Sequence, residues 1–581
     1  MKTYLIVAAL LALTLTACKD EPGCGDCNTL PLPFITDPLR ADAGCDWPQW
    51  GQNWSHTGRA CASPQGLGTV LATVTFDPFV ALEVEEAARL FGEGALYVHY
   101  GSPVVVGNDL YVEVKSGAYV SCGGQSPPSP CGFDAWNQQS WTVKHLAWES
   151  GALVPKASFA SSWKPPPWQV VGGWEPSFQP VVHEDVVWVA GAEGTVIRLD
   201  RQLGNPQTIN PFTTANSNRH VTGPLVVDVD GTLLYNVIEL DPLMPTTADA
   251  QGYLVRVSPN GSPSKVQYQS IVSGAPAAGD QCPFSYAAGQ IPGPYPAPVP
   301  VPTGPCGSQR PGWNSAPSIG PGGVIFVVSR AHYASNDSSL VALNPDLSPK
   351  WTFRMREILS DGCGVLATCR QGAPTGVDPA TGLKPTVRVV DQASSVPVAL
   401  PDGAVLYGGQ TNYNGGRGHL VKVSPDGHLM GTYDFGWDVT PAVWVHDNTY
   451  SIVTKDNHYP VSATTDGPYY ITQLSRDLHP EWKFTSTETR SCTTQPDGGL
   501  SCISDHPDGF EWCINAPAVG PDGTVYGNSE DGRVYAIRQG GTLIEQRFLL
   551  QSLGAAYTPI VVDAQGRVYS MNGGVMTIIG Q

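Results

Sequence analysis

Residues 517–527 read PAVGPDGTVYG: a proline opens a short apolar run, a turn with aspartate and glycine follows, and a second apolar run begins. Short apolar, β-branched runs around a tight turn predict a β-hairpin. The pattern occurs eight times, and the other copies begin at Pro103, Pro180, Pro224, Pro317, Pro397, Pro441 and Pro559. The closest copies are 42 to 44 residues apart, about the length of one four-stranded propeller blade. The sequence therefore predicts a repeat architecture.

A third apolar run, such as VYAIR at 534–538, follows most hairpins, and several copies continue into a fourth run with two aromatic residues. The eighth copy stops after its third run at Gln581, whereas an unassigned apolar run, TVLATVTF at 69–76, precedes the first copy. We therefore predict an all-β fold, an eight-bladed β-propeller of four-stranded antiparallel blades, with seven blades as the alternative. Residues 69–76 are expected to pair near 575–579 and close the ring, which removes exposed sheet edges.

Long insertions are expected on one face of this ring. In an antiparallel four-stranded blade, the loop between the second and third strands emerges on the same face as the link to the next blade. The long insertions occupy these positions, at 115–140, 276–313, 355–392, 454–468 and 486–512. We call this side the decorated face and the opposite side, with its short turns, the bare face.

The decorated face is the candidate binding surface, because insertions in repeat folds often carry function. The alternative is that the loops only cap the central channel. Segments 276–313 and 486–512 lie outside the expected strands, so their deletion is expected to leave the ring folded. The aromatic residues expected on this surface are Trp136, Tyr286, Tyr295, Trp313 and Trp512.

The N-terminal residues predict export. A basic start, an uncharged apolar stretch and small residues before position 18 form a signal that is too short to span a membrane. The stretch Leu15-Thr16-Ala17-Cys18 resembles the bacterial lipobox, which implies lipidation of Cys18 and removal of residues 1–17; an ordinary secretion signal is the alternative. Lys19 then favours anchoring in the outer membrane of a bacterial cell envelope. The expected organisation is a signal peptide (1–17), a flexible tether (18–44) and one propeller domain (45–581).

Fourteen cysteines in an exported chain indicate disulfides rather than metal thiolates. Close pairs within loop-like sequence predict five local bonds, Cys45–Cys61, Cys122–Cys131, Cys282–Cys306, Cys363–Cys369 and Cys492–Cys502. The sequence does not assign Cys24, Cys27 or Cys513, and Cys513 is an alternative partner for a cysteine of the last pair.

No motif predicts catalysis or metal binding. The chain lacks HExxH, GxSxG and phosphate-loop patterns, and its twelve histidines are scattered. The net charge of −19 argues against nonspecific nucleic-acid binding. Four carboxylates cluster at Asp497, Asp505, Asp508 and Glu511, and a solvated charged loop is favoured there over an acid/base pair.

The repeats resemble those of PQQ-type propellers, the fold of quinoprotein alcohol dehydrogenases and of many non-enzymatic relatives. The resemblance rests on the repeated P-x-V-x-x-D-G-x-V-Y core, on W-x-F in the fourth strand, and on DWPQWGQN at 46–53 with Thr57-Gly58, and covers most of 46–581. The dehydrogenases stack the quinone on a disulfide between adjacent cysteines, and this chain has no such dipeptide. The resemblance therefore favours the non-enzymatic branch without a cofactor.

We expect a lipid-anchored envelope scaffold that binds a protein partner or surface ligand through the decorated face. Its contact with the membrane is expected only through the lipid, and no nucleic acid is expected. In broad plan the chain resembles the propeller lipoprotein of the outer-membrane β-barrel assembly machinery, although its long loops imply a different partner. The alternative is an enzyme: a divergent quinoprotein oxidoreductase or a polysaccharide-active propeller that uses loop carboxylates and aromatic residues.

Overall fold

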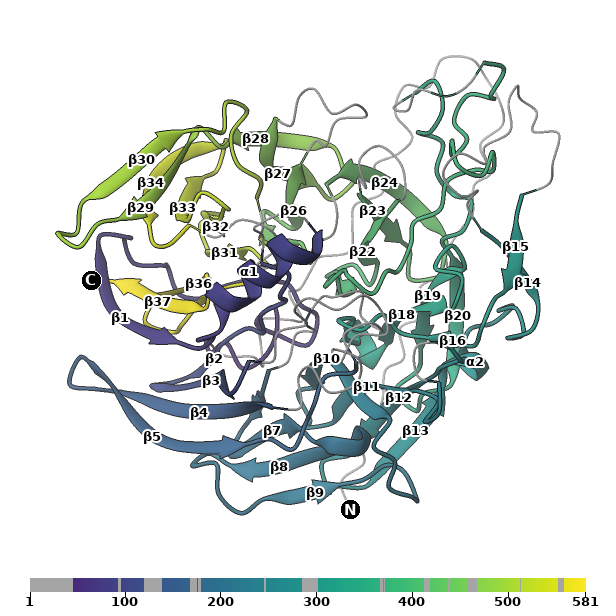
Figure 1. Ribbon diagram of the computed structural model, residues 1–581, viewed down its shortest axis with the longest axis horizontal. Helices are drawn as coiled ribbons and strands as arrows, with labels where there is room; N and C mark the ends of the chain where they lie inside the picture. Colours follow the sequence, from purple (N-terminus) through teal and green to yellow (C-terminus); the bar gives the residue numbers. More distant parts are fainter. Residues whose placement is uncertain are drawn as a thin grey trace, which may run out of the picture.

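The protein folds as an eight-bladed β-propeller (Figure 1). The computed structural model describes residues 45–91, 96–119, 138–167, 175, 179–244, 247–284, 301–365, 369, 371–411, 418–436, 439–457, 468–512, 514–551 and 559–581. Eight antiparallel sheets of four main strands surround one axis, which confirms the predicted fold and excludes the seven-bladed alternative. Within these residues, no helix has the length and apolar character that a membrane span requires.

The first four blades follow one another along the chain. Blade one comprises β2 (Val104–Val106), β3 (Asp109–Gly117), β4 (Gln139–Glu149) and β5 (Ala152–Ala160). Blade two comprises β6 (Val181–His183), β7 (Val186–Ala190), β8 (Val196–Asp200) and β9 (Gln207–Ile209). Blade three comprises β10 (Arg219–Val227), β11 (Leu233–Glu239), β12 (Gln251–Val257) and β13 (Pro263–Gln267). Blade four comprises β17 (Ser318–Ile319), β18 (Ile325–Ala331), β19 (Ser338–Leu343) and β20 (Pro349–Arg354), and β16 (Gln309–Arg310) also pairs with β18.

The last four blades complete the ring. Blade five comprises β21 (Val398–Ala399), β22 (Val405–Gln410), β23 (Gly418–Val423) and β24 (Leu429–Phe435). Blade six comprises β25 (Ala442–His446), β26 (Thr449–Asn457), β27 (Tyr469–Ser475) and β28 (Pro480–Thr485). Blade seven comprises β31 (Ala518–Val519), β32 (Val525–Asn528), β33 (Arg533–Arg538) and β34 (Thr542–Phe548). Blade eight comprises β35 (Ile560–Val562), β36 (Val568–Asn572), β37 (Val575–Gly580) and the N-terminal β1 (Thr69–Thr75).

The remaining elements lie between the blades. Two extra hairpins pair β14 (Gln281–Pro283) with β15 (Thr303–Pro305), and β29 (Arg490–Thr494) with β30 (Leu500–Ser504). The helices are α1 (Val80–Phe91) and α2 (Tyr268–Ile271), and there are two 3₁₀ turns, η1 (Ala192–Gly194) and η2 (Pro321–Gly323).

Burial explains why the inner strands are easy to recognise in the sequence as continuous apolar runs. Every residue of β22 and β23 is buried, because neighbouring blades cover both faces of these strands. Such strands are continuous apolar runs rather than alternating ones. The outer strand β24 is half exposed and correspondingly more polar, which is why the fourth strands are the least regular part of the repeat.

The turn residues of the repeat are explained by local hydrogen bonds. In the turn between β31 and β32, the Asp522 carboxylate accepts the N–H of Thr524, two residues further on. The N–H of Gly523 reaches the carbonyl of Gly520, and Gly523 adopts a φ of +78° that favours glycine. The Asp-Gly pair therefore recurs because the tight turn requires both residues.

The ring closes between the two ends of the domain. β1 pairs antiparallel with β37, with Thr69 opposite Gly580 and Thr75 opposite Val575, and the two strands lie side by side at the C-terminus in Figure 1. The predicted closure is therefore confirmed. It gives the last blade its fourth strand and ties the first part of the domain to the last.

Residues 47–65, which we call the hub segment, form hydrogen bonds with all eight blades in sequence order, through the backbone at seven blades and through the Gln49 side chain at blade three. The contacts join Trp47 to Val105, Pro48 to Val182, Gln49 to Val227, Trp54 to Ile319, Ser55 to Ala399, Thr57 to Val443, Gly58 to Val519 and Gln65 to Gly566. Nearly all the partners lie on first strands next to the following turn, so the segment lines the axis at the bare face. From the sequence alone, only residues 46–53 with Thr57-Gly58 stand out, through their resemblance to the stretch that precedes the first blade in PQQ-type propellers.

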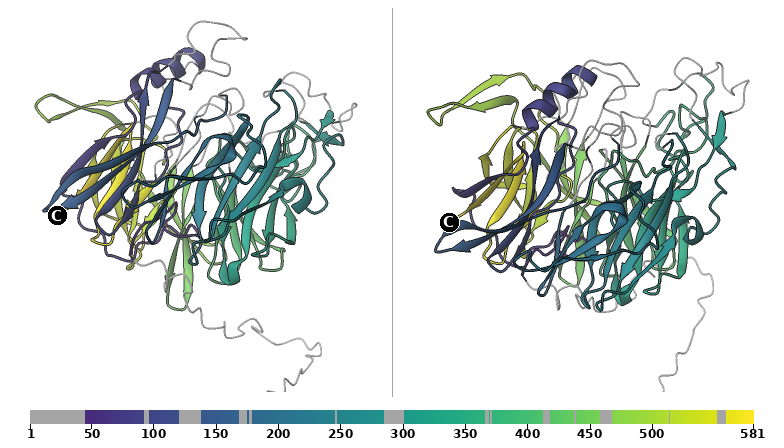
Figure 2. Two further views of the ribbon diagram at one scale, coloured as in Figure 1. Left: turned by 90° about the horizontal axis from the view of Figure 1, so that it is seen from below. Right: turned by 60° about the horizontal axis from the view of Figure 1, so that its bottom comes forward.

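The connections gather on the other side of the disc. Figure 2 shows α1 and the hairpins β14–β15 and β29–β30 on one side of the ring. This is the decorated face, as predicted from the insertions. Helix α1 was not predicted; it lies in the link between blades eight and one and is rich in good helix formers.

A pair of glycine variants tests the hub segment. Gly58 (φ +61°) and Gly107 (φ +62°) both adopt the left-handed conformation, but a Cβ at Gly58 would lie 2.5 Å from the Pro517 carbonyl oxygen, whereas one at Gly107 meets no atom within 4 Å. We expect Gly107→Ala to lower the free energy of unfolding by about 1–2 kcal/mol and Gly58→Ala by about 3 kcal/mol or more. Chemical denaturation measures both losses, and equal losses would contradict the proposed importance of the hub contact.

Candidate functional site

The ends of the insertions, where they join the blade strands, are part of the folded core. β16, inside the predicted insertion 276–313, adds a strand to blade four through Gln309 and Arg310. Two other insertions begin later than predicted, because β3 continues to Gly117 and β26 to Asn457. The expectation that 276–313 lies outside the blades is therefore wrong, whereas 486–512 contains no blade strand, because β29 and β30 pair only with each other. Complete removal of 276–313 would take a strand from blade four.

Two of the predicted surface aromatic residues are instead buried. Trp313 is fully buried and packs in a cluster with Ile238, Leu240 and Ala250. Trp512 is also fully buried, and its ring lies 5.0 Å from that of Tyr535. Both residues fasten a connection to the next blade, so neither is available to a partner. The other three candidates, Trp136, Tyr286 and Tyr295, lie outside the described residues.

Disulfides hold several of the insertions. The structure contains Cys282–Cys306, Cys363–Cys369 and Cys492–Cys502, and it also contains Cys45–Cys61 around most of the hub segment. A crosslink within a long loop offsets part of the entropy that the loop loses on ordering. Cys122–Cys131 stays a prediction because both residues lie outside the described parts, as do Cys18, Cys24, Cys27 and Cys513.

The most exposed apolar side chains are concentrated on the decorated face, while less exposed ones also lie on outer strands, at Val70, Leu429, Met430, Leu543 and Ile544. Leu243, between β11 and β12, is 89% exposed, and Ile503 on β30 is 69% exposed. Further large apolar side chains are exposed in the connections and on α1, namely Leu82, Met244, Val365, Leu500 and Leu550. In the described turns of the bare face, Val229 is the large apolar residue exposed in this way. Isolated exposed apolar residues are ordinary, but their concentration on one face indicates an interaction surface.

The acidic loop residues singled out from the sequence are solvated. Asp497, Asp505 and Asp508 are exposed at the hairpin β29–β30 and the turn that follows it. Asp505 pairs with His506, whose hydrogen bond lowers the pKa of the carboxyl to about 2. The three aspartates therefore belong to a solvated loop, as favoured from the sequence.

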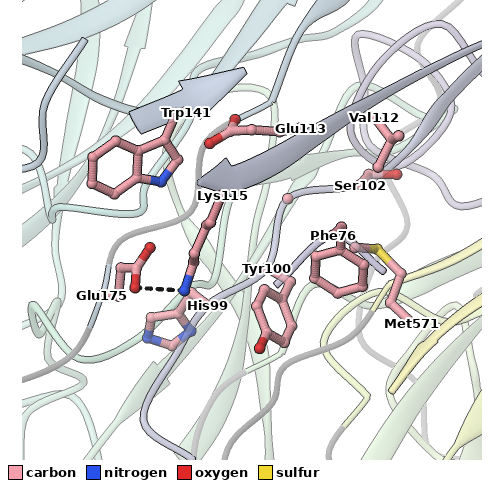
Figure 3. Close-up of a pocket in the computed structure, with 11 residues that line it drawn as sticks. Phe76, His99, Tyr100, Ser102, Val112, Glu113, Lys115, Trp141, Glu175 and Met571 are labelled. Atoms are coloured by element: carbon pink, nitrogen blue, oxygen red, sulfur yellow. Dashed lines mark hydrogen bonds and ion pairs between the residues drawn. The ribbon is translucent and has the colours of Figure 1, made fainter. Parts of the chain in front are cut away.

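A small, partly open cavity lies between blades one and eight, near α1 and on the same side of the ring. It has about 30 Å³ of room and is lined by Phe76, His99, Tyr100, Gly101, Ser102, Val112, Glu113, Lys115, Trp141, Glu175 and Met571. Figure 3 shows the Lys115 ammonium group directed toward Glu175, with Tyr100 and His99 nearby. None of these residues is among the candidates that the sequence predicts, because they are far apart in the chain.

Lys115 links three carboxylates across this cavity. Its Nζ lies 2.6 Å from Asp77 Oδ2, 3.0 Å from Glu83 Oε1 and 2.7 Å from Glu175 Oε2. The Tyr100 hydroxyl donates a hydrogen bond to Asp77 at 2.8 Å. One buried ammonium group thus joins the start of α1, the end of β3 and Glu175.

The pKa values of the four carboxyls around Lys115 are shifted in different directions. Burial raises the pKa of Glu83 to about 8, and burial also raises the pKa values of Glu175 and Glu113. Burial opposes ionisation of Asp77 too, but the charge and hydrogen bond of Lys115 lower the pKa of Asp77 overall. The pKa of Lys115 is raised well above its usual range because these carboxylates outweigh its own burial.

Protonated and ionised carboxyls beside one ammonium group are chemically able to relay a proton. The cavity limits this chemistry, because about 30 Å³ accommodates only one or a few water molecules by the usual requirement of roughly 10–15 Å³ each. An organic substrate does not fit. The geometry therefore favours a structural, hydrated charge cluster over an active site.

The residues also do not fit a quinone cofactor. The chain has no adjacent cysteines on which a quinone would stack. At the decorated end of the channel, His99 Nε2 lies 2.8 Å from the carbonyl oxygen of Gln392, and these residues come from opposite sides of the ring. Protein atoms thus occupy the axis at this end of the channel, where a quinone would need free space.

Comparison with known proteins gives similarities of fold. No protein-family profile matches the sequence, and no curated protein is significantly similar to it. Three solved structures share 12% identity with the chain: a europium-containing methanol dehydrogenase (TM-score 0.49, 91% of this chain and 89% of that chain), the quinohemoprotein alcohol dehydrogenase from Comamonas testosteroni (0.49, 94% and 82%) and BamB from Moraxella catarrhalis (0.38, 88% and 99%).

The buried carboxyls predict a pH dependence of stability. Between about pH 4.5 and 8, the folded protein keeps the Glu83 proton that the unfolded chain releases, so the free energy of unfolding falls as the pH rises, by up to about 1.4 kcal/mol per pH unit. We expect Glu83→Gln to reduce this slope, whereas Glu85→Gln, at an exposed position of the same helix, leaves it unchanged. Denaturation curves at pH 5, 6.5 and 8 measure the slopes, and identical slopes in all three proteins would contradict the prediction.

Proposed function

We propose that the protein is a lipid-anchored scaffold of the bacterial outer membrane and that its decorated face binds a protein partner. The observation that carries this proposal is that the four most exposed large apolar side chains of the described residues, Leu243, Met244, Val365 and Ile503, all lie on that face. Apolar area without a partner costs free energy in water, roughly 25 cal/mol per Å². A binding surface is the functional reason to retain it.

The nature of the surface supports a protein partner over a small molecule. The exposed apolar residues are distributed over several connections and α1, whereas the cavity beside Lys115 has room only for water. Protein partners bind to broad surfaces, while small ligands need enclosed pockets of some hundreds of Å³. Buried tryptophans and disulfides hold the roots of the loops, so less conformational entropy is lost when a partner binds.

The hairpin β29–β30 offers the sharpest test. We expect Leu500→Ser with Ile503→Ser to weaken binding at least about tenfold, because both side chains are exposed there and central apolar contacts carry most of an interface's energy. A photo-crosslinker in place of Thr493, on the neighbouring strand, should capture the partner in envelope preparations, and titration with the identified partner then measures affinity.

The matched control is Leu429→Ser with Met430→Ser on β24. These residues are similarly exposed, but they lie on the outer strand of blade five, away from the decorated face. The control should bind like the unmodified protein. Equal binding by all three proteins, or an equal loss in both double variants, would show that the decorated face is not the interface.

The anchoring part of the proposal has a separate test. Cys18 follows Leu15-Thr16-Ala17, so Cys18→Ser should abolish incorporation of a labelled fatty acid and move the protein from the membrane fraction to the soluble fraction. The folded domain should keep its melting temperature, because the anchor precedes it. Lipid labelling that persists in the variant would contradict lipidation at this residue.

A further inference from the structure

Three residues from two segments meet at the edge of blade five. His419 lies near the start of β23, and Asp434 lies directly opposite it near the end of β24. Side chains of directly opposed residues project from the same face of a sheet. Asp361 comes from the link between blades four and five and reaches the same place.

The donor atoms of the three side chains converge. His419 Nε2 forms a hydrogen bond with Asp361 Oδ2 and lies 3.8 Å from Asp434 Oδ1. One donor atom from each residue lies within 4.8 Å of the other two. His419 is only 3% exposed, while the Asp361 and Asp434 side chains are 19% and 27% exposed. The imidazole is thus fixed in the protein, and the carboxylates lie at its more open side.

The link that carries Asp361 is braced. Cys363 is bonded to Cys369, and its backbone exchanges hydrogen bonds with Val377 and Gly376, both at 2.7 Å. The preceding residue, Gly362, packs so closely that a Cβ would lie 2.0 Å from the Val377 carbonyl oxygen. Asp361 is therefore held in place by its own loop and does not depend on His419 for its position.

We propose that Asp361, His419 and Asp434 form a binding site for a divalent transition-metal ion, with zinc as the preferred ion. Zinc takes imidazole nitrogen and carboxylate oxygen at about 2.0–2.2 Å, and donors bound in this way lie about 3.3–3.6 Å apart in tetrahedral geometry. The 3.8 Å separation of His419 Nε2 and Asp434 Oδ1 is close to this value. Two carboxylates also supply the negative charge that a dication requires.

Metal binding requires the lone pair of His419 Nε2, so the neutral imidazole carries its proton on Nδ1 in the bound state. The hydrogen bond between Nε2 and Asp361 is then replaced by coordination of both atoms to the ion. Three protein donors leave a fourth position open to water or to a group from a partner. The site is at the end of blade five that faces the decorated side, because β23 begins and β24 ends there.

Another buried histidine provides the comparison. His145 is 1% exposed, and its Nε2 lies 2.8 Å from Asp109 Oδ1. Asp109 is also paired with Arg201 at 2.8 Å. The described contacts place one carboxylate beside His145 and two beside His419, so this pair lacks the second oxygen donor for a metal and is a matched control.

The test is zinc titration of the full-length protein after treatment with a chelator. The unmodified protein should bind one equivalent more zinc than Asp434→Asn or Asp361→Asn, and zinc should raise the melting temperature of the unmodified protein but not of these variants. His145→Gln should behave like the unmodified protein. The readout is the difference in bound zinc between the unmodified protein and each variant. Zinc bound elsewhere, such as by Cys24 and Cys27, contributes equally to both proteins and does not affect this difference.

Affinity for zinc should fall at least about tenfold in each ligand variant. Melting temperatures without zinc show whether the variants fold. If Asp434→Asn does not fold, Asp361→Asn decides the question, since Asp361 lies outside the blade strands. The proposal is overturned if the unmodified protein binds no more zinc than the ligand variants, or if His145→Gln loses as much zinc as they do.

Discussion

The structure depends on hydrogen-bond partners for the inner edges of eight sheets around one axis. These edges carry backbone N–H and C=O groups that no neighbouring strand of the blade can pair with. The first strand of each blade has a neighbour on one side only, and its other edge faces the channel. The hub segment supplies hydrogen-bond partners to these edges in blade order, from Trp47 at blade one to Gly58 at blade seven, with the Gln49 side chain serving blade three; Gln65 then bonds to the first turn of blade eight. It therefore protects edges that would otherwise be open and fixes the blades relative to one another. β1 then continues directly from this segment to complete the last blade.

This arrangement explains why the two faces differ. The hub segment and the short turns fill the axis at the bare face, so long insertions are accommodated at the other end of the blades. The insertions have folded roots and exposed tips: Trp313 and Trp512 are buried at the roots, whereas Leu243 and Ile503 are exposed at the tips. A rigid base with apolar projections is suited to holding a partner, and the burial of the two tryptophans contributes to this rigidity.

Buried charges join the connections to the ring. Lys115 ties α1 and Glu175 to blade one through three carboxylates. In the link to blade five, Asp391 accepts two hydrogen bonds from Arg310, at 2.7 and 2.8 Å, and one from Arg330. Buried ion pairs add little net stability over apolar packing, but loss of one partner is costly. Their role here is therefore to specify where each connection docks, which apolar contacts alone would leave less defined.

The sequence by itself determined the repeat, the blade number, the closing strand and several local disulfides, because each depends on residues close in sequence or on a period that is repeated eight times. The pattern of proline, apolar run and Asp-Gly turn reflects burial on both faces of a strand and a turn that needs glycine. Only the tertiary structure decided that Trp313 and Trp512 are buried, that the hub segment visits every blade, and that Lys115 and His419 gather their carboxylates. These contacts join residues tens to hundreds of positions apart, and their geometry is set by how the blades pack.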